Sequence, residues 1–329
     1  LFDITGFVKI EVSGKGALAL LQKVCTNNID VKVGKVVYTV ISNIYGGIKS
    51  DLTVSRLEED KFWILAGAGN GMIDLSWFKE NAPKDGSVTI IDWTSAYAGV
   101  GLWGPNSRKV LETLCEDDDV SNEAFPFFSI KNLSISHIPC IAVRISYIGE
   151  LGWEIYTPTE YGLTLWDELK EKSQEFNIIC SGAGAFESLR LEKGYRSLGA
   201  DIHTNSNPYE AGLGFTVKLK KEQDFIGKEA LTKLKQEPLK QKLCCMIMED
   251  NEGMALGKEP IYDESSNPVG YVTSTNYGYF IDKHILYGYL PSSHSKEGTK
   301  LEVGYFGKRY PVKVTKEPLL DPENMRLKS

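Results

Sequence analysis

Residues 146–156 read Ser-Tyr-Ile-Gly-Glu-Leu-Gly-Trp-Glu-Ile-Tyr, and they join two segments with strand character. Residues 141–145 before them are rich in apolar and β-branched side chains, as expected of a buried strand. A second strand is expected from residue 154 until Pro158 stops it. Gly149 and Gly152 allow a tight turn between the two strands, because glycine adopts positive φ without strain. The segment therefore predicts a hairpin whose turn carries a tyrosine, two carboxylates and a tryptophan.

Two interpretations of this turn stay open from its own residues. In the first, it is an ordinary hairpin turn and Glu150 is solvated. In the second, it is a ligand site in which Tyr147 and one carboxylate face a planar ring that forms hydrogen bonds. The rest of the chain has to decide between the two.

Length, charge and composition exclude several classes of partner. The chain has 329 residues, which suits two or three domains. Its 44 acidic and 37 basic residues give a net charge of −7, which argues against nucleic acid or an anionic membrane as the main partner. No apolar run approaches the roughly 20 residues of a membrane-spanning helix.

The cysteines and histidines indicate neither disulfides nor a metal site. The six cysteines show no Cys-x-x-Cys spacing, and scattered thiols in a chain of this size suggest a reducing compartment. We therefore expect the cytoplasm or the mitochondrial matrix. The four histidines lie far apart in the sequence, so no metal-ligand cluster is expected.

An acidic residue stands inside a predicted hairpin near the start of the chain. Residues 35–43 and 48–56 are strand-like, and the second segment contains Asp51. An unpaired carboxylate is costly to bury, so Asp51 faces either solvent or a site. Because strand residues alternate between faces, Leu52 and Val54 take the core side and Asp51 points away from it.

The glycine-rich turn at residues 67–71 superficially resembles a dinucleotide-binding turn. That fingerprint requires a sixth-position glycine, where this chain has Met72, and an acid about 20 residues further on, which is also missing. We therefore expect no NAD site here.

The pattern of expected helices and strands changes near residue 240. Before this point, helical patterns alternate with strands, including a strand expected at residues 214–220. Residues 233–242 are charged, contain Pro238 and suggest a linker. Beyond it, short strands at turn-rich intervals predict a small barrel or sandwich, at residues 243–248, 268–275, 284–290 and 305–314. We expect one domain at residues 1–240 and another at residues 241–329.

Several segments together resemble one family, the glycine cleavage T protein or aminomethyltransferase family. The similar segments are residues 46–52 (Gly-Gly-Ile-Lys-Ser-Asp-Leu), 147–154, 188–192 (Ser-Leu-Arg-Leu-Glu) and 207–212 (Asn-Pro-Tyr-Glu-Ala-Gly). Details at residues 48–54, 191–196 and 224–231 look closer to one branch, the folate-binding half of the dimethylglycine and sarcosine dehydrogenases. The resemblance is collinear and runs from Leu1 to about Pro318.

The resemblance implies a fold and a ligand. The fold would be α+β, with two α/β lobes and a small C-terminal β-barrel around a central hole that receives tetrahydrofolate. In this family pattern, Glu154 would accept hydrogen bonds from the pterin ring, since a carboxylate can accept two parallel bonds. Asp51 would sit beside the nitrogens that take the one-carbon unit. The remaining residues implied to line the folate site are Tyr147, Phe127, Tyr195 and, more weakly, Tyr38 and Thr39.

Two positions depart from the T protein pattern. The T protein has an arginine where this chain has Phe186, and an asparagine where it has Gly67. The dehydrogenase branch also lacks both residues, so these differences favour that branch over a lipoyl-protein substrate. The dehydrogenases carry a flavin domain, and this sequence contains none, so FAD would belong to an upstream domain or another subunit.

The resemblance thus implies a tetrahydrofolate-binding module for one-carbon transfer. It would capture an iminium or formaldehyde, derived from a small N-methyl amine, as 5,10-methylene-tetrahydrofolate. The alternatives are a T protein acting on an aminomethyl-lipoyl carrier, and a non-catalytic regulatory relative such as the pyruvate dehydrogenase phosphatase regulatory subunit.

Overall fold

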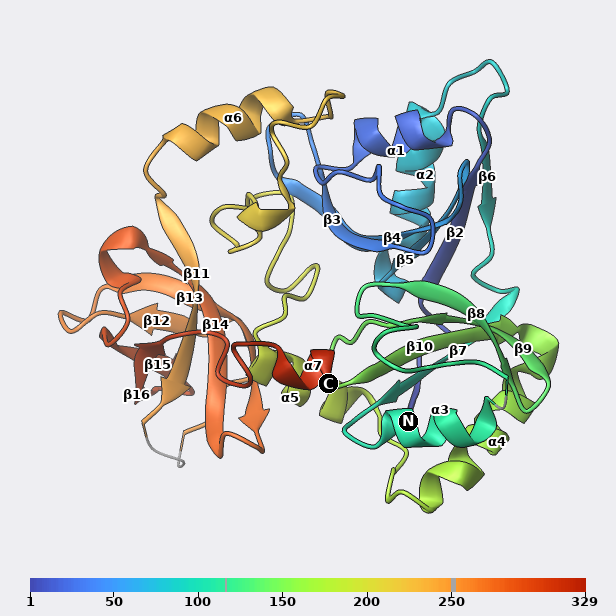
Figure 1. Ribbon diagram of the computed structural model, residues 1–329. Coiled ribbons are helices and arrows are strands. Elements are labelled where there is room, and N and C mark those ends of the chain that lie inside the picture. Colours follow the sequence, from blue (N-terminus) through green and yellow to red (C-terminus); the bar gives the residue numbers. More distant parts are fainter. Residues whose placement is uncertain (116, 250–252) are drawn as a thin grey trace.

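The computed structural model describes residues 1–115, 117–249 and 253–329. Two five-stranded antiparallel sheets and a closed barrel make up its β structure (Figure 1). In Figure 1 the barrel lies to the left and the two sheets to the right. No helix within the described ranges is long and apolar enough to cross a membrane.

The first sheet has the strand order β3-β4-β5-β2-β6. Its strands are β2 (Val8–Ser13), β3 (Val36–Ser42), β4 (Ile48–Glu58), β5 (Lys61–Ala66) and β6 (Thr89–Asp92). Helices α1 (Ala17–Val24) and α2 (Gly71–Asn81) cover one face. Helix α1 buries Leu20, Leu21 and Val24, whose spacing of three and four residues forms one apolar stripe. That stripe packs on Leu52 and Val54, the core side that the sequence predicted for β4.

The second sheet has the order β1-β7-β10-β9-β8. Its strands are β1 (Phe2–Asp3), β7 (Tyr97–Trp103), β8 (Ile130–Ile135), β9 (Ile138–Val143) and β10 (Gly152–Pro158). Helices α3 (Ser107–Leu114) and α4 (Gly162–Gln174) pack on its outer face, where Val110, Leu165 and Leu169 meet Trp153 and Ile155.

Strand β10 is the central strand of this sheet and pairs with β7 and β9. It is buried on both faces: Trp153 and Ile155 point to the helices, and Tyr156 lies with the residues packed between the sheets. Its first residue must be glycine, because Gly152 has φ of +152° and a Cβ there would lie 2.0 Å from the Leu102 carbonyl oxygen.

The inner faces of the two sheets pack on each other. Trp63 of the first sheet contacts Tyr156 of the second edge-to-face, with ring centroids 5.3 Å apart. Leu65, Trp103 and Phe2 belong to the same buried cluster. The lobes therefore form four layers in the order helices, sheet, sheet, helices. Polar groups on the inner faces are enclosed between two apolar layers.

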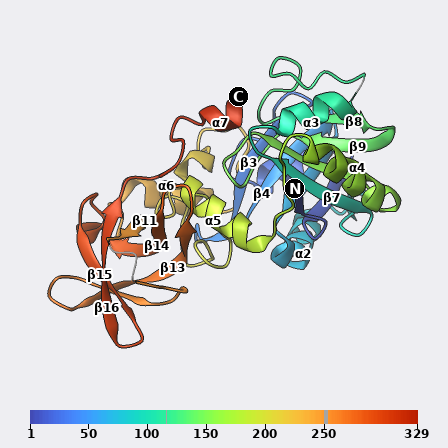
Figure 2. The same ribbon diagram turned by 90° about the horizontal axis from the view of Figure 1, so that it is seen from below.

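The closed barrel has the order β11-β14-β13-β12-β15-β16. Its strands are β11 (Gln241–Met248), β12 (Pro260–Tyr262), β13 (Pro268–Gly278), β14 (Lys283–Pro291), β15 (Lys300–Tyr305) and β16 (Lys308–Thr315). Helix α5 (Ala183–Lys193) packs on β13 and β14 and lies between the barrel and the sheets (Figure 2). The predicted α+β class with a C-terminal barrel is confirmed.

The remaining elements are short. They are helices α6 (Lys228–Gln236) and α7 (Met325–Lys328), and the 3-10 turns η1 (Ala68–Asn70), η2 (Thr159–Tyr161), η3 (Gly214–Thr216) and η4 (Ser292–His294).

Two predictions about secondary structure were wrong. Residues 214–220 do not form a strand: they begin with η3, in which Thr216 and Val217 donate backbone hydrogen bonds to the carbonyls three residues before them. Residues 305–314 are not one strand, because Phe306 and Gly307 form the turn between β15 and β16. Gly307 has φ of +77°, which ends the extended run.

Candidate functional site

Asp51 and Tyr38 form a hydrogen-bonded pair on the inner face of the first sheet. Asp51 pairs with Val40 across the β3–β4 ladder, and Tyr38 lies two residues before Val40, so the three share one face. The Tyr38 hydroxyl donates to the Asp51 Oδ2 atom at 2.8 Å. The Tyr38 ring in turn stacks on the exposed ring of Phe215, with centroids 6.2 Å apart.

Burial changes the acidity of this pair. It raises the pKa of the Asp51 carboxyl to about 6, although the Tyr38 hydrogen bond opposes the shift. The pKa of Tyr38 is raised well above its usual range by burial and by the neighbouring Asp51 charge, so the phenol keeps its proton and remains a donor. A carboxyl with a pKa near neutral pH can hold or release a proton under physiological conditions.

A second buried acid lies behind Asp51. Asp74 of α2 is 2% exposed and accepts hydrogen bonds from Ser50 Oγ at 3.0 Å and Asn70 Nδ2 at 2.9 Å. Burial raises the pKa of Asp74 to about 7, and the charge of Asp51 contributes. Asp74 was not predicted from the sequence, although an acid in the first turn of a helix is a recognisable signal.

Three aromatic rings gather around the turn that precedes β10. Tyr147 stacks on Phe186 with centroids 5.0 Å apart, and on Tyr195 with centroids 5.9 Å apart. The Tyr147 hydroxyl donates to the main-chain carbonyl of Arg196 at 2.5 Å. The structure therefore brings Tyr147 and Tyr195 together and adds Phe186 to them.

The aromatic group and the Asp51–Tyr38 pair are close enough to interact electrostatically. The pKa of Tyr147 is raised mainly by burial, and the charge of Asp51 adds to the shift. Tyr147 likewise contributes to the raised pKa of Tyr38. Four predicted site residues thus lie in one neighbourhood: Tyr38, Asp51, Tyr147 and Tyr195.

Glu154 lies on β10, where it pairs with Gly101 and Val143 and is 5% exposed. The Tyr156 hydroxyl donates to its Oε2 atom at 2.7 Å, and burial raises the pKa of Glu154 to about 7. The positive charge of buried Lys9 opposes that shift.

Within the described residues, Glu154 makes no hydrogen bond or ion pair with Asp51 or Tyr147. Tyr156 could have been foreseen as its partner, because residues two apart on a strand share a face.

Among the described residues, neither Thr39 nor Phe127 makes a hydrogen bond or ring contact with Asp51 or Tyr147. Thr39 lies on the opposite face of β3 from Tyr38, where its hydroxyl accepts from the Asn27 backbone N–H at 3.1 Å and donates to the Val40 carbonyl. The alternation of a strand places neighbouring residues on opposite faces, so the two could not both line one slot. Phe127 contacts Phe128 edge-to-face, at 4.5 Å between centroids.

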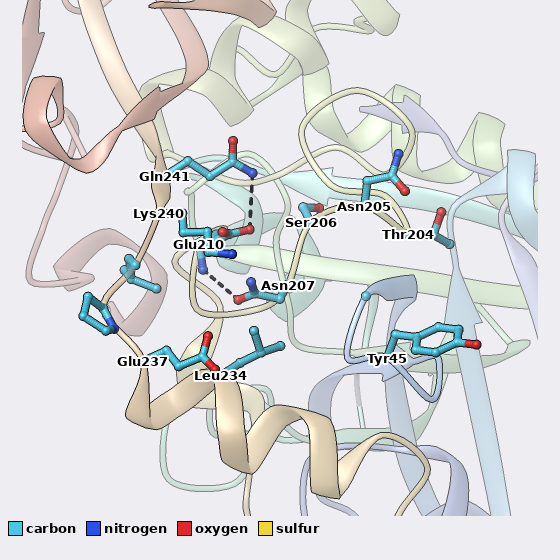
Figure 3. Close-up of a pocket in the computed structure, with 13 residues that line it drawn as sticks. Tyr45, Thr204, Asn205, Ser206, Asn207, Glu210, Leu234, Glu237, Lys240 and Gln241 are labelled. Carbon is cyan, nitrogen blue, oxygen red and sulfur yellow. Dashed lines mark hydrogen bonds between the residues drawn. The ribbon is translucent and has the colours of Figure 1, made fainter.

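A surface cavity of about 270 Å³ lies elsewhere in the molecule, between the β3–β4 turn, α6 and the start of the barrel (Figure 3). Glu210 and Gln241 face each other in it, joined by a hydrogen bond of 3.3 Å. None of the seven predicted site residues lines this cavity. Among the residues that the structure describes, no three His, Cys, Asp or Glu side chains gather as a metal ion would require.

Comparisons with known proteins identify the family. The GCVT N-terminal domain matches residues 1–221, and the glycine cleavage T-protein C-terminal barrel domain matches residues 241–321. The aminomethyltransferase of Symbiobacterium thermophilum is 34% identical, covering 97% of this chain and 85% of that protein. The chain therefore belongs to the glycine cleavage T-protein family, as the sequence resemblance indicated.

A solved structure and a longer relative add detail. The crystal structure of the glycine cleavage system aminomethyltransferase T from Bartonella henselae matches with a TM-score of 0.86 and 26% identity, over 97% of this chain and 85% of that one. The human mitochondrial dimethylglycine dehydrogenase is 38% identical over 98% of this chain. The chain spans only 37% of the length of that dehydrogenase.

We expect Glu154→Gln to stabilise the protein at high pH. The folded state binds the Glu154 proton more tightly than the unfolded state, since the pKa rises from 4.5 to about 7. Wild-type stability is therefore lost as pH rises through this window, and a neutral glutamine avoids the loss. The free energy of unfolding of the variant, relative to wild type, should increase by about 1–3 kcal/mol between pH 4.5 and pH 8.

Urea unfolding at a series of pH values measures this difference. The exposed Glu160, just beyond the same strand, offers a matched control in Glu160→Gln, which should show little pH-dependent change. A difference between Glu154→Gln and wild type that stays constant with pH would show that Glu154 is not held in a low-dielectric environment.

Proposed function

We propose that this chain is a tetrahydrofolate-binding module that captures a one-carbon unit from an N-methyl amine of the dimethylglycine or sarcosine type. The product would be 5,10-methylene-tetrahydrofolate. The observation that carries the proposal is the Tyr38–Asp51 pair beside the Tyr147 ring, with a carboxyl whose pKa is about 6. The similarity to dimethylglycine dehydrogenases along nearly the whole chain supports this donor class.

The residues present fit a reduced pterin. Such a ring offers N–H and amino donors on one edge and a flat apolar face. Glu154 has a carboxylate oxygen, Oε1, beyond the one that Tyr156 occupies, and a carboxylate is suited to a pair of donors. Tyr147 and Tyr195 supply ring surfaces, which bind flat rings by stacking. We keep Phe127 as a proposed wall of the same site. Thr39 would act only indirectly, by holding β3 in place.

Tetrahydrofolate supplies the two nitrogen nucleophiles that bind the one-carbon unit. Each nitrogen forms one new bond to the carbon. When the one-carbon unit is an iminium, the amine and a proton leave; when it is formaldehyde, water leaves. Asp51 has two tasks in this reaction. Its carboxylate stabilises the cationic carbon, and it accepts the proton that leaves a nitrogen. Tyr38 holds Oδ2 of Asp51 in place, so that the other oxygen faces the reactants.

The one-carbon unit would be generated by a flavin on a separate domain or subunit. The dehydrogenase relatives are more than twice as long as this chain, which leaves room for such a domain. We also propose a domain boundary at residue 240, between α6 and β11. The mitochondrial relatives favour the matrix over the cytoplasm as the compartment.

The second candidate is a transferase acting on an aminomethyl-lipoyl carrier, which the bacterial aminomethyltransferase relatives support. Phe186 favours the first candidate: its ring packs against Phe2, Trp103 and Tyr147 and brings no charge to the site. Release of ammonia from an aminomethylated lipoyl protein, with tetrahydrofolate present, would instead favour the carrier.

The purified chain should bind tetrahydrofolate with a Kd on the order of micromolar, an affinity usual for a ligand of this size. Glu154→Gln should weaken binding by about 1.5–3 kcal/mol, because one oxygen becomes an N–H donor facing ring donors. Isothermal titration calorimetry measures both values, with Glu160→Gln as the control. No heat and no thermal shift at millimolar tetrahydrofolate would end the proposal.

Asp51→Asn should leave the tetrahydrofolate Kd within a few-fold of wild type and slow one-carbon capture by about 10²-fold or more. The wild-type rate should also fall as pH drops below about 6, where the Asp51 carboxyl is protonated, and the variant should lack this dependence. The assay uses formaldehyde and tetrahydrofolate, and measures 5,10-methylene-tetrahydrofolate against the uncatalysed rate. A variant with normal rates would remove Asp51 from the mechanism.

A further inference from the structure

The chain returns from the barrel to the lobes through residues 316–329, which we call the C-terminal strap. It follows β16 and includes α7, which lies between the barrel and the second sheet in both views (Figures 1 and 2). Leu320 donates a backbone hydrogen bond to the Glu192 carbonyl, and Ser329 accepts bonds from Arg108 and Arg144. The strap is therefore docked on the lobes along its whole length.

One side chain of the strap reaches a buried arginine beside the candidate site. The two oxygens of Glu317 accept from the two terminal nitrogens of Arg196, at 2.8 and 3.0 Å. Arg196 is 8% exposed, its Nε donates to the Ala211 carbonyl at 3.0 Å, and its guanidinium lies over the Tyr287 ring of the barrel. Among the described residues, Glu317 is the only acid that forms an ion pair with Arg196.

The main chain at the same arginine contacts the aromatic residues around Tyr147. The Arg196 carbonyl accepts the hydroxyl proton of Tyr147, and the preceding carbonyl, of Tyr195, accepts from Arg190 at 3.0 Å. Tyr195 and Arg196 are thus fixed at both the side chain and the main chain. A shift of Arg196 would move the hydroxyl partner of Tyr147 and the ring of Tyr195 together.

We infer that Glu317 is a positioning residue for the candidate folate site, acting through Arg196 on Tyr147 and Tyr195. The C-terminal strap then helps to shape that site instead of only packing beside it. The inference rests on the proposed function and deepens it, because it assigns a role in ligand binding to a residue that does not touch the ligand.

A second contact of the strap allows a test of whether Glu317 positions site residues or only holds the strap on the lobes. Asp321 accepts from Lys193 Nζ at 3.3 Å and holds the strap on α5. Its charge adds to the burial that raises the pKa of Tyr195, but no hydrogen bond in the described structure links Asp321 to the Tyr147 hydroxyl. Asp321→Asn removes this ion pair of the strap while leaving the Glu317–Arg196 pair in place. Glu317 and Asp321 therefore make a matched pair of test positions.

The experiment compares Glu317→Gln with Asp321→Asn and with Glu302→Gln, which removes an exposed ion pair of the barrel with Arg309. Calorimetry gives the Kd for tetrahydrofolate, and the formaldehyde assay gives the rate at saturating tetrahydrofolate. Glu317→Gln should raise the Kd and the KM for tetrahydrofolate roughly tenfold, as expected for misplaced binding groups, with kcat within about threefold of wild type. Both control variants should bind within about twofold of wild type.

A double variant tests the route through the hydroxyl of Tyr147. If Glu317 acts through this contact, Glu317→Gln combined with Tyr147→Phe should lose no more affinity than the weaker-binding single variant, because coupled residues are not additive. Additive losses, or equal losses in Glu317→Gln and Asp321→Asn, would overturn the inference. So would an unchanged Kd in Glu317→Gln. Failure of the wild-type chain to bind tetrahydrofolate would instead refute the proposed function.

Discussion

The packing of the two sheets against each other is the constraint on which the candidate site depends. Trp63 meets Tyr156 across the interface, and the neighbouring apolar side chains of both inner faces are removed from water. Every polar group on these faces then carries a desolvation cost unless it finds a partner. The Tyr38 hydroxyl donates to the half-buried Asp51 and the Tyr156 hydroxyl to the buried Glu154, so each carboxylate keeps one phenolic donor. Both carboxyls nevertheless have raised pKa values, since one hydrogen bond does not compensate for lost solvation.

The same constraint explains why the chemistry is gathered at one end of the first sheet. The pairing of β4 with β5 begins at Leu52, opposite Ala66, and Asp51 is the residue just before Leu52. The sheet covers Asp51 on one side, and Tyr147 approaches from the loop that precedes β10 in the second sheet. The barrel contributes Tyr287 and the strap that follows it contributes Glu317, and both hold Arg196. Three parts of the fold thus meet at Tyr147, although the residues involved lie far apart in the sequence.

Sequence reasoning foresaw much of the fold, because local patterns determine most of it. Strands β3 and β4 lie where the strand-like residues 35–43 and 48–56 predicted them, and β4 turns Leu52 and Val54 to the core. The prediction of a strand at residues 214–220 was wrong, because a short run with strand propensity does not show whether a neighbouring strand is there to pair with it. The strand pattern left a barrel and a sandwich open, because closure depends on the pairing of β11 with β16, and the family resemblance pointed to the barrel.

The site was foreseen only in part. Tyr38, Asp51, Tyr147 and Tyr195 come together, whereas Thr39 is turned away by the alternation of β3. Phe186 and Arg196 were not expected in the site, because their contacts with Tyr147 are made by a ring and a carbonyl brought in from another element. Such contacts leave no periodic signal in a single sequence. Tyr156 could have been predicted as a partner of Glu154, because it lies two residues later on the same strand.

The central claim is that reduced folate binds next to Asp51 and Tyr147, with its pterin ring at Glu154. A crystal structure of the chain with bound tetrahydrofolate tests it most directly. The account predicts the pterin ring within hydrogen-bond distance of Glu154 and its reactive nitrogens beside Asp51, with the Tyr147–Arg196 hydrogen bond retained. Folate bound instead in the cavity lined by Glu210 and Gln241, with the surroundings of Asp51 and Tyr147 unchanged, would contradict it.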